Sequence, residues 1–321
     1  MEQVKQARYA LVFPGQGSQY IGMGLEISEE FPSADKIFQS AEQITNLAIR
    51  NISFSGPEED LMETSITQPC LLTTSIAFYT VFQEHFSLKP EFICGHSAGE
   101  YAALVAAGVL SFTDAIRLIQ VRGSLMSKMQ KGGMVALKGI TLQEAEELCR
   151  QNVQTGGALV PANLNSPEQF VISGDDASVE AAIVFAFENN IKAIPLAVSG
   201  AFHSPLMQKA AKLFANETHN VRFYDATESV ISNVTAEPVI NGHEWMRLLS
   251  QQMTSSVRWE SSIRYVQQQG IEIFVEVGPG QILSKLINKI VPSALILNIE
   301  DINSLQTTVA KMNEIFKAQL V

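Results

Sequence analysis

Hydrophobic positions along the chain alternate between short continuous runs and longer stretches with helical spacing. Apolar runs of strand type occupy residues 10–13 and 92–94. Apolar residues three or four positions apart predict helices at residues 33–45, 78–86, 113–129 and 262–269, and a further helix after Gly99. Such alternation of strands and helices is typical of a parallel sheet flanked by helices.

A different pattern begins at the Lys-Gly-Gly segment of residues 131–133. The next elements read β-α-β-β-α-β, at residues 134–137, 142–149, 158–161, 170–173, 178–188 and 193–197. This is the order of a small ferredoxin-like unit. We therefore expect an α/β protein in which residues 134–197 form a small ferredoxin-like subdomain, inserted into a larger domain made of residues 1–133 and 198–321.

Composition narrows the possible partners. The net charge of −11 argues against binding to nucleic acid or to anionic lipid through broad electrostatic attraction. The cysteines are three in number and far apart, which argues against a disulfide framework and against a zinc site. The longest apolar runs, such as residues 181–187, are far short of a bilayer span. We expect a cytoplasmic protein with no nucleic-acid partner, no membrane partner and no metal.

A candidate nucleophile lies in residues 95–99, which read Gly-His-Ser-Ala-Gly and match the pattern G-x-S-x-G. The motif follows the strand-like run at 92–94 and leads into a helical pattern. A strand-turn-helix elbow of this kind lifts the hydroxyl of Ser97 out of the sheet and places it near a helix N-terminus. The alternative interpretation is an ordinary glycine-rich turn.

A serine nucleophile needs a base, and His203 is the candidate among five histidines. It follows the run at 193–197 and precedes Ser204 and Pro205, which together signal a helix start. That position puts the imidazole on a loop at the mouth of the sheet. The alternative interpretation is a solvated loop histidine without a catalytic role. We expect His96 to point away from Ser97. Since no aspartate stands out as a third member, we expect a pair oriented by a backbone carbonyl.

Arg122 occupies the apolar face of the helix predicted at residues 113–129, whereas Arg117 points to solvent. Burial of a guanidinium is costly unless an anion meets it, and its planar fork suits a carboxylate. The anion could be internal, for instance Glu100, or it could be the carboxylate of a substrate. A serine nucleophile near such an arginine suggests transfer of an acidic acyl group.

The glycine-rich segment at residues 13–22 follows the first strand but is no dinucleotide fingerprint, because Tyr20 stands where the third glycine belongs. A loop at this place can supply a backbone N–H group to an oxyanion. It can equally be a structural turn.

Taken together, these segments resemble the malonyl-CoA:acyl carrier protein transacylase family, which serves fatty acid and polyketide synthesis. The likeness runs through nearly the whole chain. Its motifs stand in family order at residues 13–19, 67–69, 95–100, 122–123, 171–174, 201–204 and 276–280. The resemblance implies an α/β-hydrolase-like large domain and transfer of malonyl from coenzyme A, by way of an acyl-serine, to the phosphopantetheine thiol of an acyl carrier protein.

The resemblance also implies roles for individual residues. Ser97 is the nucleophile, His203 the general base and acid, and Arg122 the clamp on the malonyl carboxylate. The oxyanion hole consists of the backbone N–H groups of Gln16 and Ala98. Three further residues complete the implied site: the carbonyl of Gln252 orients His203, with help from Asn233, and Phe202 crowds out an α-methyl branch. No cofactor is permanently bound, and we expect a monomer.

Two positions depart from the family pattern. Ala98 is smaller than the usual residue after the serine, and Gly200 stands where many synthase-embedded relatives have histidine. Because carrier proteins of this family are acidic, we also expect a local basic surface around the cleft. Its candidate residues are Arg117, Lys128, Lys131 and Arg258.

Three rival functions remain at this stage. An acyl hydrolase of the same fold that strips acyl groups from carriers would have no use for Arg122. A patatin-like lipase would need an Asp-Gly motif that the sequence lacks. A non-enzymatic scaffold would not require the serine, the histidine and the arginine together.

Overall fold

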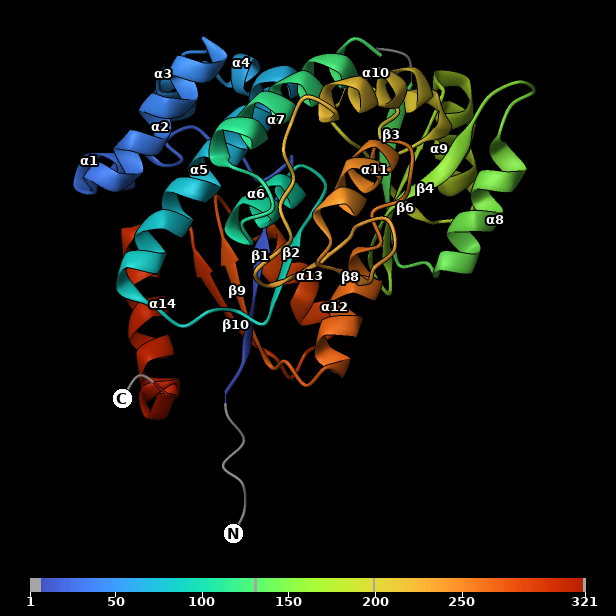
Figure 1. Cartoon of the computed structure of the whole chain (residues 1–321). Coiled ribbons are helices and arrows are strands. Elements are labelled where there is room, and N and C mark those ends of the chain that lie inside the picture. The colour runs from blue at the N-terminus through green and yellow to red at the C-terminus, as the bar shows by residue number, and fades with distance from the viewer. Residues whose placement is uncertain (1–6, 130–131, 199, 320–321) are drawn as a thin grey trace.

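The computed structural model describes residues 7–129, 132–198 and 200–319, and two sheets organise it (Figure 1). The larger sheet has the strand order β10-β9-β1-β2-β7-β8. All neighbouring strands in it are parallel except β7 and β8. Its strands are β1 (Tyr9–Phe13), β2 (Phe92–Gly95), β7 (Ser229–Ile231), β8 (Pro238–Val239), β9 (Ile273–Val277) and β10 (Leu295–Ile299).

Helices cover both faces of this sheet, as the alternation of side chains along β1 requires. Leu11 and Phe13 pack into one core, whereas Ala10 and Val12 pack into a second core on the opposite face. A strand that is buried on both faces has a continuous apolar sequence, which is why residues 10–13 predicted a strand. The parallel sheet expected from the sequence is therefore present.

The helices of this larger part fall into two groups. Before the small sheet come α1 (Leu25–Glu30), α2 (Pro32–Thr45), α3 (Ile49–Ser55), α4 (Glu58–Met62), α5 (Thr64–His85), α6 (Gly99–Ala106) and α7 (Phe112–Ser127). After it come η1 (Pro205–Met207), α10 (Gln208–Thr218), α11 (Gly242–Gln252), α12 (Trp259–Gln268), α13 (Ile282–Ile290), α14 (Ile302–Ile315) and η2 (Lys317–Gln319). No helix in the described ranges has the length and apolar character needed to cross a membrane.

The helix predicted at residues 78–86 is only the last part of α5. Most of α5 is buried on all sides and it contains Pro69 in its interior. A helix without a polar face lacks the periodicity that identifies amphipathic helices in a sequence. This explains why its first four turns were missed.

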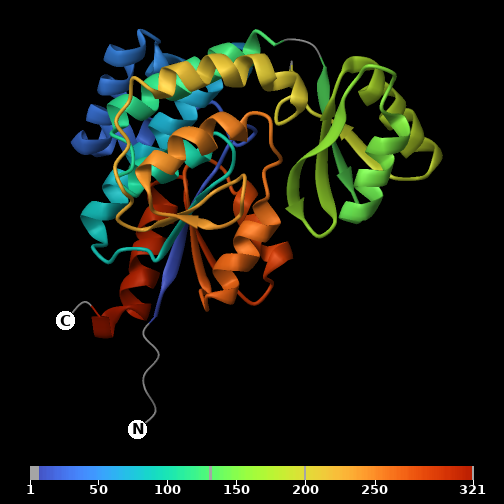
Figure 2. The same cartoon turned by 45° about the vertical axis from the view of Figure 1, so that its right-hand side comes forward.

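The smaller sheet is antiparallel and stands beside the larger part (Figure 2). Its strands have the order β4-β5-β3-β6, with α8 (Leu142–Asn152) and α9 (Asp176–Glu188) packed on one face. The bounds of these strands are β3 (Gly133–Lys138), β4 (Leu159–Ser166), β5 (Gln169–Gly174) and β6 (Lys192–Pro195). The β-α-β-β-α-β order expected from the sequence is observed, while the domain division at residues 134–197 stays a prediction.

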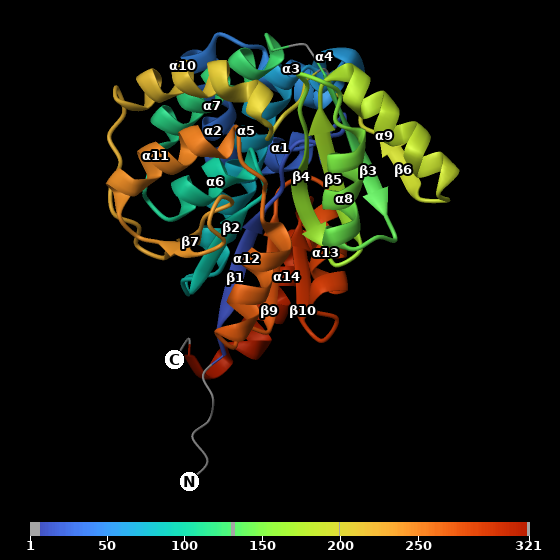
Figure 3. The same ribbon diagram turned by 90° about the vertical axis from the view of Figure 1, so that its right-hand side faces the viewer.

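Backbone hydrogen bonds join the smaller sheet to the larger part beside α12 (Figure 3). The N–H of Leu164 in β4 donates to the carbonyl of Val257 over 2.9 Å, and the N–H of Val257 donates to the carbonyl of Ala162 over 2.8 Å. The other face of the small sheet, which includes Met134, packs into the large core. The small sheet is thereby fixed over the carboxyl ends of β1 and β2.

The first prediction concerns the close contact between α6 and β1. A Cβ atom on Gly99 would lie 2.2 Å from the carbonyl oxygen of Phe13 and 2.6 Å from that of Pro14. Because both atoms belong to the backbone, Gly99→Ala should lower the free energy of unfolding by about 3 kcal/mol. Chemical denaturation measures this, with Gly133→Ala as the control, since the nearest atom to a Cβ there lies at 3.8 Å. Equal stability of the two variants would contradict the prediction.

Candidate active site

Ser97 lies at the turn between β2 and α6, in the strand-turn-helix setting that the sequence predicted. Its φ of 52° is in the left-handed region, which non-glycine residues rarely occupy. The N–H of Ser97 donates to Oδ1 of Asn233 over 2.7 Å. Strain of this kind persists where surrounding contacts hold it, and here it turns the hydroxyl out of the sheet.

His203 meets Ser97 from the loop between β6 and η1. Its Nε2 lies 2.7 Å from Oγ of Ser97, and its Nδ1 lies 2.8 Å from the carbonyl oxygen of Gln252. A carbonyl can only accept, so Nδ1 carries the proton and the unprotonated Nε2 accepts from the serine hydroxyl. His203 also has a positive φ, of 56°. The two residues that the sequence singled out are thus in direct contact.

Burial and the nearby charge of Arg122 together lower the pKa of His203 to about 3, while the hydrogen bond to the carbonyl of Gln252 opposes this shift. The side chain is only 3% exposed. An imidazolium there would lose its hydration and face a guanidinium, so the neutral ring is the stable form at ordinary pH. The neutral ring is also the form that can accept a proton.

Arg122 extends from α7 into the same place and is completely buried. It donates from NH1 to Oε1 of Gln68 over 2.7 Å, and from NH2 to Oγ of Ser97 over 3.1 Å and to Oε1 of Gln252 over 2.9 Å. Its Nε has no partner among the described residues. All of these acceptors are neutral. Burial lowers the pKa of the guanidinium, because the charged form loses its hydration there.

Glu100, the internal anion considered for Arg122, does not contact it directly. The carboxylate accepts from Nε2 of Gln252 over 2.6 Å and from the N–H of Asn233 over 2.7 Å. No salt bridge involves Arg122 within the described residues. The hydrogen bonds of this positive charge beside Ser97 are therefore to amide and hydroxyl oxygens, and the guanidinium also lies 5.8 Å from the centre of the Tyr101 ring.

Gln252 and Asn233 lie behind the reacting groups, away from the cavity wall. Gln252 is fully buried, and Asn233 is 1% exposed. Asn233 donates from Nδ2 to the carbonyl of Gly95 over 2.6 Å and makes no hydrogen bond to His203 in the described part of the chain. Asn233 therefore has no direct contact with His203, and its amide instead holds the elbow. That it helps to orient His203 stays a prediction.

A cavity of about 70 Å³ opens at Ser97 and continues into a larger one of about 310 Å³. The smaller cavity is lined by both halves of the structure, including Gln16, Gln68, Ser97, Ala98, Arg122, Met134, Leu196, Phe202 and His203. A short acyl group could occupy the smaller cavity, while a longer chain attached to it would extend through the larger one.

The loop after β1 packs directly on the elbow, since a Cβ on Gly15 would lie 2.3 Å from the carbonyl oxygen of His96. Gln16 and Ala98 both line the small cavity. Neither backbone N–H has an acceptor within the described residues. Two free N–H groups on one cavity wall are suited to an oxyanion.

Phe202 is 5% exposed and also lines the small cavity. A Cβ on Gly200 would lie 2.7 Å from Cε1 of Phe202. Gly200, where many synthase-embedded relatives have histidine, therefore leaves room for the phenyl ring of Phe202.

His96 turns away from Ser97, as expected. Its Nε2 lies 2.9 Å from Oδ1 of Asn165, and its ring lies 5.5 Å from that of Trp259. Burial lowers the pKa of His96, while the bond to Asn165 opposes this shift. Gln68 was not predicted as a site residue, although it lies in the family motif at residues 67–69. An uncharged amide next to a proline in an apolar stretch could have indicated a buried polar contact.

Comparisons with known proteins identify the relatives of this chain. The family model described as acyl transferase domain matches residues 10–314. The malonyl CoA-acyl carrier protein transacylase of Bacillus subtilis (strain 168) is 38% identical over 312 residues, which cover 96% of this chain and 98% of that protein. The corresponding protein of Haemophilus influenzae is 39% identical, over 92% of this chain and 96% of its own length.

Solved structures give the same result. The malonyl CoA-acyl carrier protein transacylase of Coxiella burnetii superposes with a TM-score of 0.92 at 35% identity, over 95% of this chain and 98% of that one. A malonyl-transacylase solved in complex with its type II PKS acyl-carrier protein also has a TM-score of 0.92 and 35% identity, over 95% of this chain and 100% of that one.

The second prediction follows from the lowered pKa of His203. If the neutral imidazole activates Ser97, the rate at which a fluorophosphonate modifies this serine should stay level as the pH falls from about 8 to about 5. The imidazole takes up its proton only at lower pH, because its pKa is about 3. Mass spectrometry at timed intervals measures the rate, with Ser97→Ala as the unreactive control. A half-loss of rate near the ordinary histidine value, about pH 6.5, would contradict the assignment.

Proposed function

Since this chain belongs to the acyl transferase domain family, we propose that it transfers a malonyl group from malonyl-CoA to the phosphopantetheine thiol of an acyl carrier protein. The proposal covers fatty acid and polyketide synthesis alike, because relatives from both settings match. The observation that carries it is a buried guanidinium, without a carboxylate partner, in contact with a serine that is paired to a neutral histidine.

In the first half-reaction, Ser97 is the nucleophile and His203 is the base. Nε2 of His203 takes the hydroxyl proton as Oγ bonds to the thioester carbon. The N–H groups of Gln16 and Ala98 stabilise the negative charge on the carbonyl oxygen. When the carbon–sulfur bond breaks, His203 returns the proton to the sulfur, and coenzyme A leaves a malonyl ester on Ser97.

The second half-reaction reverses these roles on the carrier. His203 takes the proton of the phosphopantetheine thiol, and the sulfur attacks the ester carbon. As the ester bond breaks, the same proton goes to Oγ, which restores Ser97 and leaves malonyl on the carrier. A thioester and a serine ester are both activated, so the protein mainly needs to stabilise the oxyanion and to exclude water. In this proposal no permanently bound cofactor takes part, because Ser97 and His203 act directly on the thioester and the thiol. The proposal also places the protein in the cytoplasm.

Arg122 gives the reaction its preference for malonyl. A malonyl carboxylate would provide the anion that the buried guanidinium lacks, in a fork geometry that suits two parallel hydrogen bonds. An acyl hydrolase for neutral acyl chains would gain nothing from a buried positive charge next to its nucleophile, and a lipase would not either. Phe202 contributes to selectivity by filling the space that an α-methyl branch would need.

The segments 1–133 and 198–321 act, in this proposal, as the catalytic domain, and residues 134–197 act as a subdomain that covers the acyl group. Met134 and Leu196, at the two ends of this segment, line the small cavity. Their side chains would keep water from the ester.

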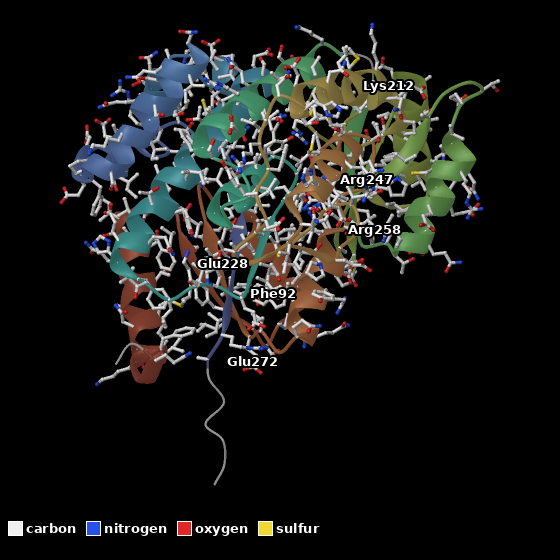
Figure 4. All side chains as sticks on the ribbon, in the orientation of Figure 1. Phe92, Lys212, Glu228, Arg247, Arg258 and Glu272 are labelled. Carbon is white, nitrogen blue, oxygen red and sulfur yellow. The ribbon has the colours of Figure 1, made fainter. Side chains whose placement is uncertain are left out.

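The acidic carrier would dock on basic side chains around the cleft. Arg117 and Lys128 are exposed on and just after α7, and Arg258 is exposed just before α12. Figure 4 labels Arg258 together with Lys212 of α10 and Arg247 of α11. Lys131, the fourth candidate, lies outside the described residues. Lys212, Arg247 and Arg258 favour a docking face formed by α10, α11 and the segment before α12.

The third prediction tests the acyl-serine. Ser97→Ala should abolish the mass increase that malonyl-CoA causes in the intact protein, because the hydroxyl of Ser97 is the one hydrogen-bonded to Nε2 of His203. Ser127→Ala, on α7, is the matched control and should be labelled like the unaltered protein. Continued labelling of Ser97→Ala would refute the role given to this serine.

The fourth prediction tests the clamp. Arg122→Ala should lower the kcat/KM for malonyl loading by about a hundredfold, because the carboxylate would then be buried without a partner. Loading of acetyl-CoA should stay the same or improve. Arg117→Ala, on the exposed face of the same helix, is the control and should change neither rate. A variant that lost both activities equally would show that Arg122 does not select the acyl group.

A further inference from the structure

Glu100 is a buried carboxylate that the proposed reaction does not use. It lies in the first turn of α6, is fully buried, and forms no salt bridge in the described part of the chain. Burial raises the pKa of Glu100 to about 8, while the hydrogen bonds from Asn233 and Gln252 and the charge of Arg122 oppose this shift. Such a group is costly to bury, so its contacts indicate what it does.

Both oxygens of Glu100 accept hydrogen bonds from groups that hold the site. Oε1 accepts from the backbone N–H of Asn233 over 2.7 Å, and Oε2 accepts from Nε2 of Gln252 over 2.6 Å. Because both neighbours are donors, the ionised carboxylate satisfies them and an uncharged amide of the same shape could not.

The contact with Gln252 determines which way the side-chain amide of Gln252 points. Its Nε2 donates to Glu100 and also to the carbonyl of Ser97 over 3.0 Å, while its Oε1 accepts from NH2 of Arg122 over 2.9 Å. If the amide turned over, its oxygen would face a carboxylate and a carbonyl, and its NH₂ group would face a guanidinium. All three contacts would then be repulsive.

We propose that Glu100 is a positioning residue for acyl selectivity, which acts through Gln252 to keep an amide oxygen against Arg122 and so fixes the guanidinium where the malonyl carboxylate needs it. This inference rests on the proposed malonyl transfer. Glu100 touches no reacting atom; the chain of contacts runs from its carboxylate to the amide of Gln252 and from there to Arg122.

A purely structural role for Glu100 would have a different signature. Its second contact, to Asn233, supports the elbow through the bonds of Asn233 to Ser97 and Gly95. Loss of this support alone would slow the loading of every acyl group equally. Loss of the orientation of Gln252 would instead reduce malonyl loading more than acetyl loading, because only malonyl needs Arg122.

The test is Glu100→Gln, assayed at about pH 9, where the carboxylate of the unaltered protein is ionised. The new amide can offer its oxygen to the N–H of Asn233, but its NH₂ group then faces Nε2 of Gln252. Gln252 must turn over and direct its own NH₂ group at Arg122. The expected result is a roughly tenfold fall in the ratio of malonyl to acetyl kcat/KM, the size of a lost hydrogen bond to a charged group.

Glu276→Gln is the matched control. Glu276 is also a fully buried carboxylate with two N–H donors, those of Leu283 and Ser284, but it has no contact with Arg122 or Gln252. Its replacement should leave the malonyl-to-acetyl ratio unchanged.

The outcomes separate this inference from the function on which it rests. If the unaltered protein loads acetyl as readily as malonyl, the proposed function is wrong. If the unaltered protein prefers malonyl and Glu100→Gln keeps that ratio, or loses both activities equally, the role of Glu100 is overturned.

Should Glu100→Gln fail to fold, Gln252→Met decides the question. This variant keeps Glu100 and removes the amide oxygen that accepts from NH2 of Arg122. We expect the ratio of malonyl to acetyl kcat/KM to fall in this variant as well. An unchanged ratio would overturn the proposal, because Glu100 is proposed to act through this amide.

Discussion

The burial of one positive charge beside the nucleophile is the constraint on which the rest of the site depends. Arg122 is completely enclosed, yet its guanidinium donates only to neutral oxygens, those of Gln68, Gln252 and Ser97. A charge without a carboxylate in direct contact is unfavourable in such a place when the site is empty. It becomes favourable when an acyl group brings its own carboxylate, so the same feature accounts for both binding and selectivity.

The charge also determines the state of the base. Arg122 and burial together keep His203 neutral, so that Nε2 is free to accept the proton of Ser97. Both Ser97 and His203 have positive φ angles, and both are held by acceptors on other elements, Asn233 for the serine and the carbonyl of Gln252 for the histidine. The strained backbone and the buried charge are thus supported by the same few amides.

Much of this could be predicted from the sequence, because the informative patterns are local. The turn at Ser97, the loop before His203 and the apolar face around Arg122 are each contained in a few consecutive residues, and the β-α-β-β-α-β order follows from turns and periodicity. The amide network could not be predicted in the same way. Gln252 lies 155 positions from Ser97, and Asn233 lies 136 positions from it, so only the fold brings them together. The long helix α5 was largely missed because burial on all sides removes its periodicity.

The most direct test of the account is a crystal structure of the protein after exposure to malonyl-CoA, with hydrolysis slowed by low temperature. The account predicts an ester on Oγ of Ser97, its carbonyl oxygen near the N–H groups of Gln16 and Ala98, and its free carboxylate within about 3 Å of the guanidinium of Arg122. An ester whose carboxylate points away from Arg122 into the larger cavity would contradict the central claim.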